Sequence, residues 1–306
     1  MTAEDPRDVE NIMSIGSTGS GKSYTFKVIG EYLSVPVEFV DCTQLSAAGY
    51  VGDSIEDYLR KVYISSEGNV DLSNRSILIL DEFDKLKKSE LGMKEAAQDS
   101  LLKLVEGHKY DVEIDKNRGT TVRLDSTGMT IVGCGAFSEI FERRENGDKQ
   151  KIGFKSQSER DREEKERLER KNSILADPYS VSDQELKDYG FKPEFIPRFQ
   201  NRNVYVPLDE AGLRDALEHS RDSVLQAKIR RYLKQFNTEL IYDDSFIEAV
   251  AAEAFRLKCG GRSLNKVCAA VFKNTDRELL RMDKTKKKVL KVTGDTVKNN
   301  KKFDLK

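Results

Sequence analysis

The sequence predicts an α/β fold in which a parallel sheet covered by helices is followed by a small, mainly helical domain. In the first half of the chain, apolar runs of strand length alternate with segments of helical periodicity, a pattern typical of parallel sheets. A glycine-rich stretch joins the first of these strands to the first helix. After Pro207 the alternation stops and helical patterns prevail. We therefore expect a large domain over residues 1–207 and a small domain over residues 208–306.

Each element follows from a local pattern of apolar residues. Strands are expected over 11–15, 37–40, 76–80 and 129–134, and helices over 21–33, 54–64 and 94–105. Alternating segments over 110–114 and 121–124 flank the turn sequence DKNRG and predict a hairpin. In the small domain, amphipathic helices are expected over 209–236, 244–257 and 262–282, and a last short strand within 289–297.

Composition narrows the class of protein. The chain has 306 residues, and its 52 Lys and Arg residues against 53 Asp and Glu residues predict no attraction to nucleic acid or to an anionic membrane. No apolar run approaches the roughly 20 residues needed to span a bilayer, and the N-terminus lacks signal-peptide features. The four cysteines form no C-x-x-C pair, and two histidines cannot complete a zinc site. We expect a soluble, cytoplasmic protein with reduced thiols.

The glycine-rich stretch GSTGSGKS satisfies the motif G-x-x-x-x-G-K-[ST] between an expected strand and an expected helix. Its glycines allow consecutive backbone N–H groups to converge on a phosphate at the positive end of the helix. Lys22 is expected to meet the β- and γ-phosphates, and Ser23 to coordinate Mg²⁺. A chance glycine-rich turn is the alternative. The candidate nucleotide-binding residues are Gly16, Ser17, Thr18, Gly19, Ser20, Gly21, Lys22 and Ser23.

A second motif, SILILDEFD, ends an apolar strand with acidic residues. Ligands of open α/β sheets bind at the carboxyl ends of the strands, which is where Asp81 and Glu82 are expected. Asp81 is the candidate Mg²⁺ ligand, and Glu82 is the candidate base that orients and deprotonates the attacking water. Acids after a strand also cap helices, and for Asp84 this alternative is favoured. Together the two motifs predict hydrolysis of a nucleotide.

These motifs belong to a longer ordered series, which resembles that of the ClpX-type AAA+ unfoldases and, less closely, that of HslU. The resemblance runs from about residue 11 to about residue 293. It implies a P-loop AAA+ domain that hydrolyses ATP with Mg²⁺, in a hexameric ring that threads unfolded protein substrates to a ClpP-like peptidase. The series is GSTGSGKS, LSAAGYVGDSIEDYL, ILILDEFDKL, SLLKLVEG, VGCGAF, PEFIPR and CGGRSL.

Two segments acquire a role only through this resemblance. In the family, a G-Y-V-G loop faces the central channel and its aromatic side chain grips the polypeptide; a tyrosine between glycines, taken alone, is more often a packed turn residue. The I-G-F tripeptide sits in a polar stretch without a local core, and the resemblance implies that it docks on the peptidase. The implied residues are Gly49, Tyr50, Val51 and Gly52 for the pore loop, and Ile152, Gly153 and Phe154 for docking.

The resemblance also implies roles for arginines. Arg198 in PEFIPR matches the arginine finger, which reaches the nucleotide of a neighbouring subunit, and Arg202 competes for that role. Arg262 in CGGRSL matches the sensor-2 arginine, which contacts the nucleotide of its own subunit. A surface arginine without function is the alternative for each.

The chain also departs from the family pattern. The zinc domain and the segment that helps to form the adenine pocket are not found before the first strand, and the strand ending in Cys134 offers no polar sensor-1 side chain. Residues 85–94 replace the second pore loop, and the hairpin replaces a basic family loop, with Arg118 or Arg123 as its counterpart only by analogy. These departures leave an alternative function, a nucleotide-binding scaffold or regulatory subunit of such a ring that does not hydrolyse ATP. A P-loop motor acting on DNA has little support from the neutral charge.

Overall fold

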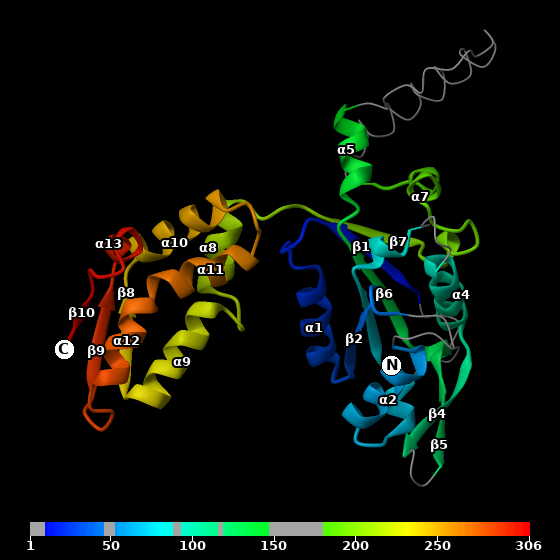
Figure 1. Ribbon diagram of the computed structural model, residues 1–306, viewed down its shortest axis with the longest axis horizontal. Coiled ribbons are helices and arrows are strands. Elements are labelled where there is room, and N and C mark those ends of the chain that lie inside the picture. The colour runs from blue at the N-terminus through cyan, green and yellow to red at the C-terminus, as the bar shows by residue number, and fades with distance from the viewer. Residues whose placement is uncertain (1–9, 46–52, 88–92, 116–118, 147–179) are drawn as a thin grey trace. The chain divides into compact units, whose positions relative to one another are not determined.

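The computed structural model describes residues 10–45, 53–87, 93–115, 119–146 and 180–306. The chain divides into two compact units, whose elements are labelled in Figure 1. The first unit comprises Met1–Gly16 and Lys22–Tyr205, and the second comprises Val206–Lys306 together with Ser17–Gly21. None of the described helices is long and apolar enough to cross a bilayer.

The first unit is built on a five-stranded parallel sheet with the strand order β2-β3-β6-β1-β7. The four expected strands are all present, within one residue of their expected limits. The edge strand β7 was not expected, because its sequence NRNVY has no alternation of apolar residues. The strands are β1 (Ile12–Gly16), β2 (Val37–Asp41), β3 (Ile77–Asp81), β6 (Thr130–Gly135) and β7 (Asn201–Tyr205).

Side chains of the central strands are buried on both faces of the sheet. On β3, Ile77 and Ile79 pack with Phe26 of α1 (Lys22–Leu33). Leu78 and Leu80, which alternate with them, join the larger core that includes α2 (Ile55–Ser65) and α4 (Met93–Glu106). The apolar run ILILD therefore forms a strand covered on both faces, as parallel sheets require. The expected α/β fold of the large domain is confirmed.

Short helices complete the first unit. Two of them, α5 and α7, lie on either side of residues 147–179 in the sequence, and neither was expected from periodicity. The short elements are α3 (Val70–Ser73), α5 (Ser138–Asn146), α7 (Asp183–Tyr189), and the 3₁₀ turns η2 (Phe83–Leu86), η3 (Ser126–Gly128) and η4 (Ile196–Arg198).

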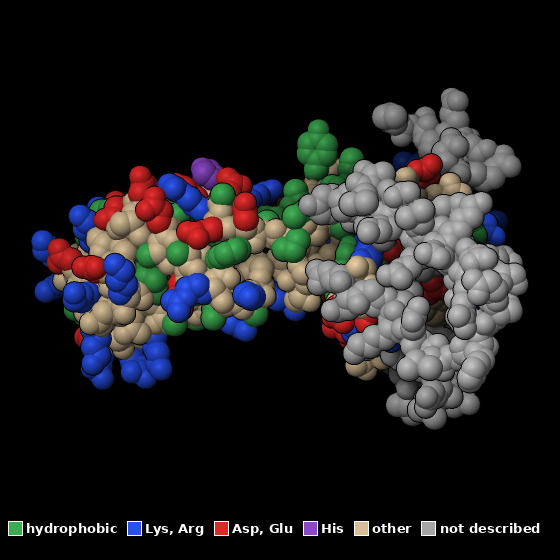
Figure 2. Space-filling view, turned by 90° about the horizontal axis from the view of Figure 1, so that it is seen from above, with side chains coloured by type: hydrophobic (Ala, Val, Ile, Leu, Met, Phe, Trp, Pro, Cys, Tyr) green, Lys and Arg blue, Asp and Glu red, His purple; other side chains and the backbone are tan. Residues whose placement is uncertain are grey.

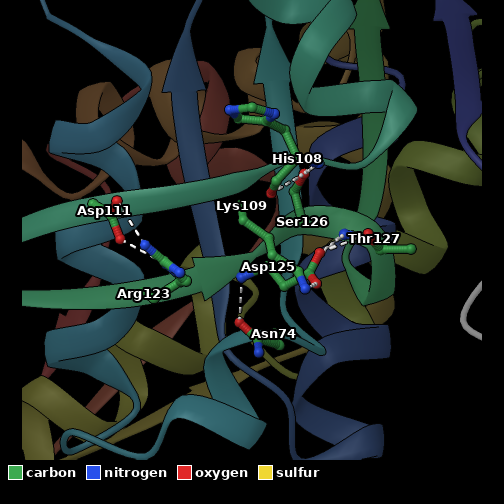
Figure 3. A network of polar contacts seen from close by, with 8 residues as sticks. All are labelled: Asn74, His108, Lys109, Asp111, Arg123, Asp125, Ser126 and Thr127. Carbon is green, nitrogen blue, oxygen red and sulfur yellow. Dashed lines mark hydrogen bonds and ion pairs between the residues drawn. The ribbon is translucent and has the colours of Figure 1, made fainter.

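The expected hairpin is formed by β4 (Lys109–Asp115) and β5 (Thr120–Asp125), which pair antiparallel. At its base, the backbone N–H of Asp125 donates to Asn74 Oδ1 (2.9 Å) (Figure 3). Further along, Arg123 makes two hydrogen bonds across the strands to Asp111 (2.8 and 3.1 Å) (Figure 3). Arg123 therefore has a carboxylate partner within the hairpin, whereas Arg118 lies outside the described residues.

The second unit combines helices with a three-stranded sheet of order β10-β9-β8. The expected last strand is present as β9, but β8 and β10 were not expected. The expected single helices over 209–236 and 262–282 are each two helices. The elements are α8 (Glu210–Glu218), α9 (Val224–Phe236), β8 (Thr238–Tyr242), α10 (Asp244–Arg256), α11 (Arg262–Val271), α12 (Lys273–Arg281), β9 (Lys288–Val292), α13 (Gly294–Lys298) and β10 (Asp304–Leu305).

Local signals explain both helix breaks. Ser223 caps α9 by accepting a hydrogen bond from the backbone of Gln226, so a new helix begins there. Phe272, which separates α11 from α12, is fully buried beside Tyr232 and Phe246. Burial of one large ring thus fixes where the second break falls.

The second unit carries an uneven surface charge. Six of the eleven residues from Arg281 to Lys291 are Lys or Arg, and only Asp283 is acidic. Figure 2 shows basic side chains around the end of this unit where β9 and β10 lie, with acidic and hydrophobic side chains between them. The near-zero net charge of the whole chain therefore does not describe this local surface.

Candidate functional site: a phosphate loop and an acidic turn at one sheet edge

The register of the sheet brings the two sequence motifs to the same edge. Leu80 on β3 lies beside Gly133 on β6, and Ile15 on β1 lies beside Gly135 on β6. Because the three strands are parallel neighbours, their carboxyl ends meet. Asp81 and Gly16, the last residues of β3 and β1, therefore lie at the edge where ligands of such sheets bind.

The phosphate loop, Gly16–Gly21, turns from β1 into the first residue of α1. The φ angles of Gly16, Gly19 and Gly21 are 153°, 81° and 93°, which residues with a Cβ rarely adopt. Lys22 is buried, and its Nζ donates to Gly16 O (2.5 Å), so the ammonium group lies at the carboxyl end of β1. The loop thus places a cation and the N-terminus of a 12-residue helix at the sheet edge.

Ser20 provides a direct test of whether this loop fits a phosphate. Its hydroxyl is buried and has no hydrogen-bond partner among the described residues. A buried polar group without a partner is costly and calls for a ligand or water. Phosphate oxygens are acceptors for hydroxyl and backbone N–H groups, so the loop fits the phosphates of a nucleotide.

Within the second unit, the start of α11 contacts the phosphate loop. The N–H of Gly261 donates to Gly19 O (2.8 Å). A Cβ on Gly19 would lie 2.5 Å from Cys259 O and 3.3 Å from the backbone N of Arg262. Glycine is therefore required at position 19 for close approach of two backbones, and this approach puts the backbone of Arg262 beside the loop.

The acidic turn, Asp81–Lys85, directs one carboxylate outward. Glu82 is exposed and adopts the left-handed conformation (φ 54°, ψ 35°), which is uncommon for a residue with a side chain. Its N–H donates to Asp81 Oδ1 (3.1 Å), and its carbonyl accepts from the N–H of Lys85 (2.8 Å). Backbone strain of this kind persists only where the surroundings impose it, and it gathers at functional sites.

Phe83 supplies part of that constraint. Its ring is fully buried and lies 5.1–5.6 Å, between centroids, from the rings of Phe191, Phe195 and Phe199. A Cβ on Gly133 would come within 2.8 Å of this ring. The residue after Glu82 is thus packed against β6 with no spare space.

The expected role of Asp84 as a helix cap is wrong. The 3₁₀ turn η2 begins at Phe83, and its N-cap residue is Glu82, with no side-chain cap hydrogen bond. Instead, Asp84 Oδ1 accepts a hydrogen bond from the N–H of Ala136 (3.1 Å), directly after β6. Its Oδ2 pairs with Lys85 Nζ (2.6 Å), and its side chain is only 4% exposed. This role could not be predicted from the sequence, because the partner lies 52 residues away in the chain.

Cys134 occupies the position between the two motifs. Burial raises the pKa of its thiol to about 12; Asp81 adds to the rise, whereas Lys22 and a hydrogen bond with Ser23 oppose it. The same neighbours show that the phosphate loop and the acidic turn converge here. The end of β6 thus carries a neutral thiol, in keeping with the expected lack of a polar sensor-1 side chain.

The pore-loop candidates Gly49, Tyr50, Val51 and Gly52 lie outside the described residues. The two ends of their segment are joined: Leu45 and Asp53 form a parallel bridge, and the N–H of Asp53 donates to Gln44 O (3.1 Å). Helix α2 follows at once, with Ser54 and Asp57 forming a capping box. The segment therefore begins and ends at a fixed point on the first unit.

The two finger candidates differ in their surroundings. Arg198 is 48% exposed and pairs with Glu106 (2.6 Å), itself 40% exposed. Arg202 is only 15% exposed and donates to Val181 O (2.9 Å) and Phe199 O (3.2 Å), besides pairing with Asp183. Arg202 thus holds its own unit together, whereas the guanidinium of Arg198 is accessible.

The docking candidates Ile152, Gly153 and Phe154 also lie outside the described residues. The residues before and after their segment are joined by a bidentate pair between Arg144 and Glu185 (2.7 and 2.9 Å). Arg144 also donates to Ser180 O (2.6 Å). Burial raises the pKa of Glu185, but hydrogen bonds from Arg144 and Ser182 outweigh it and leave the pKa below its usual value. Sequence reasoning missed this pair.

Comparison with known proteins agrees with this geometry. Residues 12–142 match the family model described as "ATPase family associated with various cellular activities (AAA)". The matched residues contain β1 to β6 and α1 to α4, and so include both the phosphate loop and the acidic turn.

The similarity extends beyond the AAA domain. The chain is 29% identical to ATP-dependent Clp protease ATP-binding subunit ClpX 3 of Methylococcus capsulatus, over 86% of this chain and 62% of that protein. It is 29% identical to the mitochondrial ATP-dependent clpX-like chaperone of Saccharomyces cerevisiae (87% and 59%), and 28% identical to ClpX of Borrelia duttonii (94% and 67%). The resemblance to ClpX-type subunits is confirmed, and the chain spans about three fifths of the first two relatives.

Proposed function

We propose that this chain hydrolyses ATP to drive protein unfolding, as a subunit of a ring that delivers polypeptide to a ClpP-like peptidase. The observation that carries the ATPase part is the convergence of the phosphate loop and Glu82 at one sheet edge inside an AAA domain. The relatives' names, Clp protease ATP-binding subunit and clpX-like chaperone, support the unfolding part.

Binding of the nucleotide follows from the phosphate loop. Lys22 and the backbone N–H groups of the loop would hold the β- and γ-phosphates, and the hydroxyl of Ser20 would gain the partner that it lacks. Ser23 and Asp81 are the residues placed to hold Mg²⁺, which supplies charge stabilisation to the phosphates when bound. The start of α11 beside Gly19 supports Arg262 as a further contact.

Hydrolysis requires a base beside the phosphate loop. Glu82 is exposed at the sheet edge, while the two residues that follow it, Phe83 and Asp84, are buried. Its carboxylate would orient a water and accept its proton as the water attacks the γ-phosphorus. A positioned base of this kind contributes about 10²–10⁴ in rate.

Arg198 is the better candidate for the finger that completes a neighbour's site. Its guanidinium is accessible, and its pairing with Glu106 is a half-exposed ion pair, worth about 0–1 kcal/mol. Arg198 can therefore exchange that partner for phosphate at little cost. Arg202 would have to abandon three partners, two of them buried backbone carbonyls.

The decisive experiment separates hydrolysis from work on the substrate. We expect wild type to hydrolyse ATP in Mg²⁺ and to unfold a tagged fluorescent reporter. Glu82→Gln should bind nucleotide with unchanged affinity and lose turnover by about 10²–10⁴. Tyr50→Ala should hydrolyse ATP and fail to unfold the reporter, whereas the control Tyr32→Ala, at an 87% exposed position on α1, should do both.

Three outcomes would contradict the proposal. Wild type that binds ATP without hydrolysing it would favour the regulatory scaffold. Unchanged ATP turnover in Glu82→Gln would contradict the assignment of Glu82 as the base. Equal losses of reporter unfolding in Tyr50→Ala and Tyr32→Ala would contradict the assignment of Tyr50 to a pore loop. Docking is tested apart from these, by adding a ClpP peptidase to wild type and to Phe154→Ala, where we expect association to be lost.

A further inference from the structure

We propose that Asp84 is a positioning residue of the hydrolytic site, which fastens the turn carrying Glu82 to the end of strand β6. This inference rests on the proposed ATPase function for its consequence, because it assigns Glu82 a support. Its structural part, the link between the acidic turn and β6, stands on the contacts of Asp84 alone.

The contacts of Asp84 satisfy both of its oxygens. Oδ1 accepts from the N–H of Ala136 (3.1 Å), and Oδ2 pairs with Lys85 Nζ (2.6 Å). The side chain is 4% exposed. A buried carboxylate is retained only with such partners, because burial without them is strongly unfavourable. Asp84 therefore links a residue two positions after Glu82 to a strand that is not its own.

The surrounding packing leaves this link no freedom. A Cβ on Gly135 would lie 2.9 Å from both the backbone N and Oδ1 of Asp84, and 2.6 Å from the ring of Phe137. Leu86, two residues further on, is buried, and its carbonyl accepts from Gln98 Nε2 (2.7 Å). The turn is thus attached on both sides of the Asp84 carboxylate.

This attachment explains how Glu82 is held in a strained conformation. The left-handed backbone of Glu82 has a cost that its own contacts do not offset, since its side chain is exposed. Phe83 packs against Gly133, and Asp84 bonds to Ala136, so two successive residues after Glu82 are fixed to β6. Losing the second contact would let the turn relax and move the Glu82 carboxylate away from the phosphate loop.

The link also bears on the missing sensor-1 side chain. The end of β6 carries Gly133, Cys134 and Gly135, none of which offers a strong hydrogen bond to a phosphate. Here a backbone N–H of the strand end is instead bonded to the acidic turn. Any displacement of β6 beside β1 would therefore be transmitted to Glu82 through Asp84.

The test compares three variants in kinetics and in amide exchange. Asp84→Ala removes both contacts, and we expect kcat to fall at least about tenfold while KM and nucleotide affinity stay within twofold. Asp84→Asn keeps an oxygen that can accept from Ala136, so kcat should stay within threefold of wild type. Lys85→Met removes the ion pair with Asp84 Oδ2 but leaves the hydrogen bond from Ala136 in place, and should leave kcat within twofold. Exchange of the Ala136 amide should quicken at least tenfold in Asp84→Ala and stay unchanged in the other two.

The outcomes are separable from those of the proposed function. If wild type shows no ATP turnover, the proposed function fails, while amide exchange at Ala136 still tests the link. If Asp84→Ala does not fold, the pair Asp84→Asn and Lys85→Met decides. The inference is overturned if Asp84→Ala keeps full kcat or slow exchange, or if folded Asp84→Asn loses kcat as Glu82→Gln does.

Discussion

The phosphate loop and the acidic turn meet at one edge of the same sheet, yet they are held in opposite ways. In the phosphate loop, the hydroxyl of Ser20 has no partner among the described residues, and a Cβ on Gly21 would meet nothing within 4 Å. In the acidic turn, Phe83 and Asp84 are buried and every nearby gap is filled.

The difference fits the roles that we propose for the two segments. A loop that encloses phosphates must keep its polar groups and its space for the ligand. A base must instead stay fixed while the reaction proceeds, because groups that are already in place need no reorganisation at the transition state. The loop is therefore open at Ser20 and Gly21, and the turn is rigid. Substitutions in the turn should reduce stability, and substitutions in the loop should reduce binding.

Phe83→Ala is expected to have the largest effect on the free energy of unfolding and to show that the acidic turn is stabilised by packing. The ring is fully buried against three phenylalanines and β6, so its removal should lower the free energy of unfolding by about 3–5 kcal/mol. Urea unfolding of both variants measures this. The control Phe39→Ala, at a position 42% exposed, should lose less than about 1 kcal/mol. Equal losses would mean that the turn is no more tightly packed than the surface.

The sequence predicted the parallel sheet well for a physical reason. Buried parallel strands such as ILILD are apolar along their whole length, so their pattern is local and can be read without knowing their partners. Strand β7, NRNVY, lies at the edge of the sheet, where polar residues are tolerated, and it was missed. The helix breaks at Ser223 and Phe272 were missed because amphipathic periodicity continues across them.

The site was predicted to the extent that it depends on residue identity. The phosphate loop and the pair Asp81 and Glu82 could be proposed because their chemistry requires certain residues at fixed spacing. The partners of Asp84, Arg198 and Arg202 come from segments distant in sequence, and nothing local indicates them. Contacts between segments that are distant in the chain therefore could not be predicted from the sequence.

Gly135→Ala tests the rigidity of the acidic turn, because it adds a single methyl group beside Asp84. That methyl would lie 2.6 Å from the ring of Phe137 and 2.9 Å from the backbone of Asp84, which cannot rotate away. We expect a loss of roughly 2–3 kcal/mol in urea unfolding. The control Gly212→Ala, in helix α8, meets only side-chain atoms at 3.2 Å or more and should change stability by less than about 1 kcal/mol. A stable Gly135→Ala variant would show that the turn can yield.

Burial of the Cys134 thiol makes the free energy of unfolding depend on pH. Burial raises its pKa from the ordinary value of 9.0 to about 12, so the folded state keeps its proton while the unfolded state loses it above pH 9. The unfolded state then binds fewer protons, and stability falls as pH rises. Between pH 8 and pH 10, wild type should lose about 1.4 kcal/mol more than Cys134→Ala. Urea unfolding at both pH values measures the difference; parallel profiles would mean that the thiol is reached by water.

Gly21→Ala should have the smallest effect on stability, although it should abolish the function of the loop. A Cβ there meets no atom within 4 Å. In the protein without bound nucleotide, the free energy of unfolding should therefore fall only because of the positive φ of 93°, by about 1 kcal/mol. The same methyl would project into a loop whose backbone must close around phosphate, so nucleotide affinity should fall at least about tenfold. Gly119→Ala, at the hairpin, has a φ of 62° and equally open space. It should share the stability loss and bind a fluorescent ATP analogue normally. If Gly21→Ala binds as Gly119→Ala does, the space in the loop is not reserved for phosphate, and the contrast between an open loop and a rigid turn loses its functional meaning.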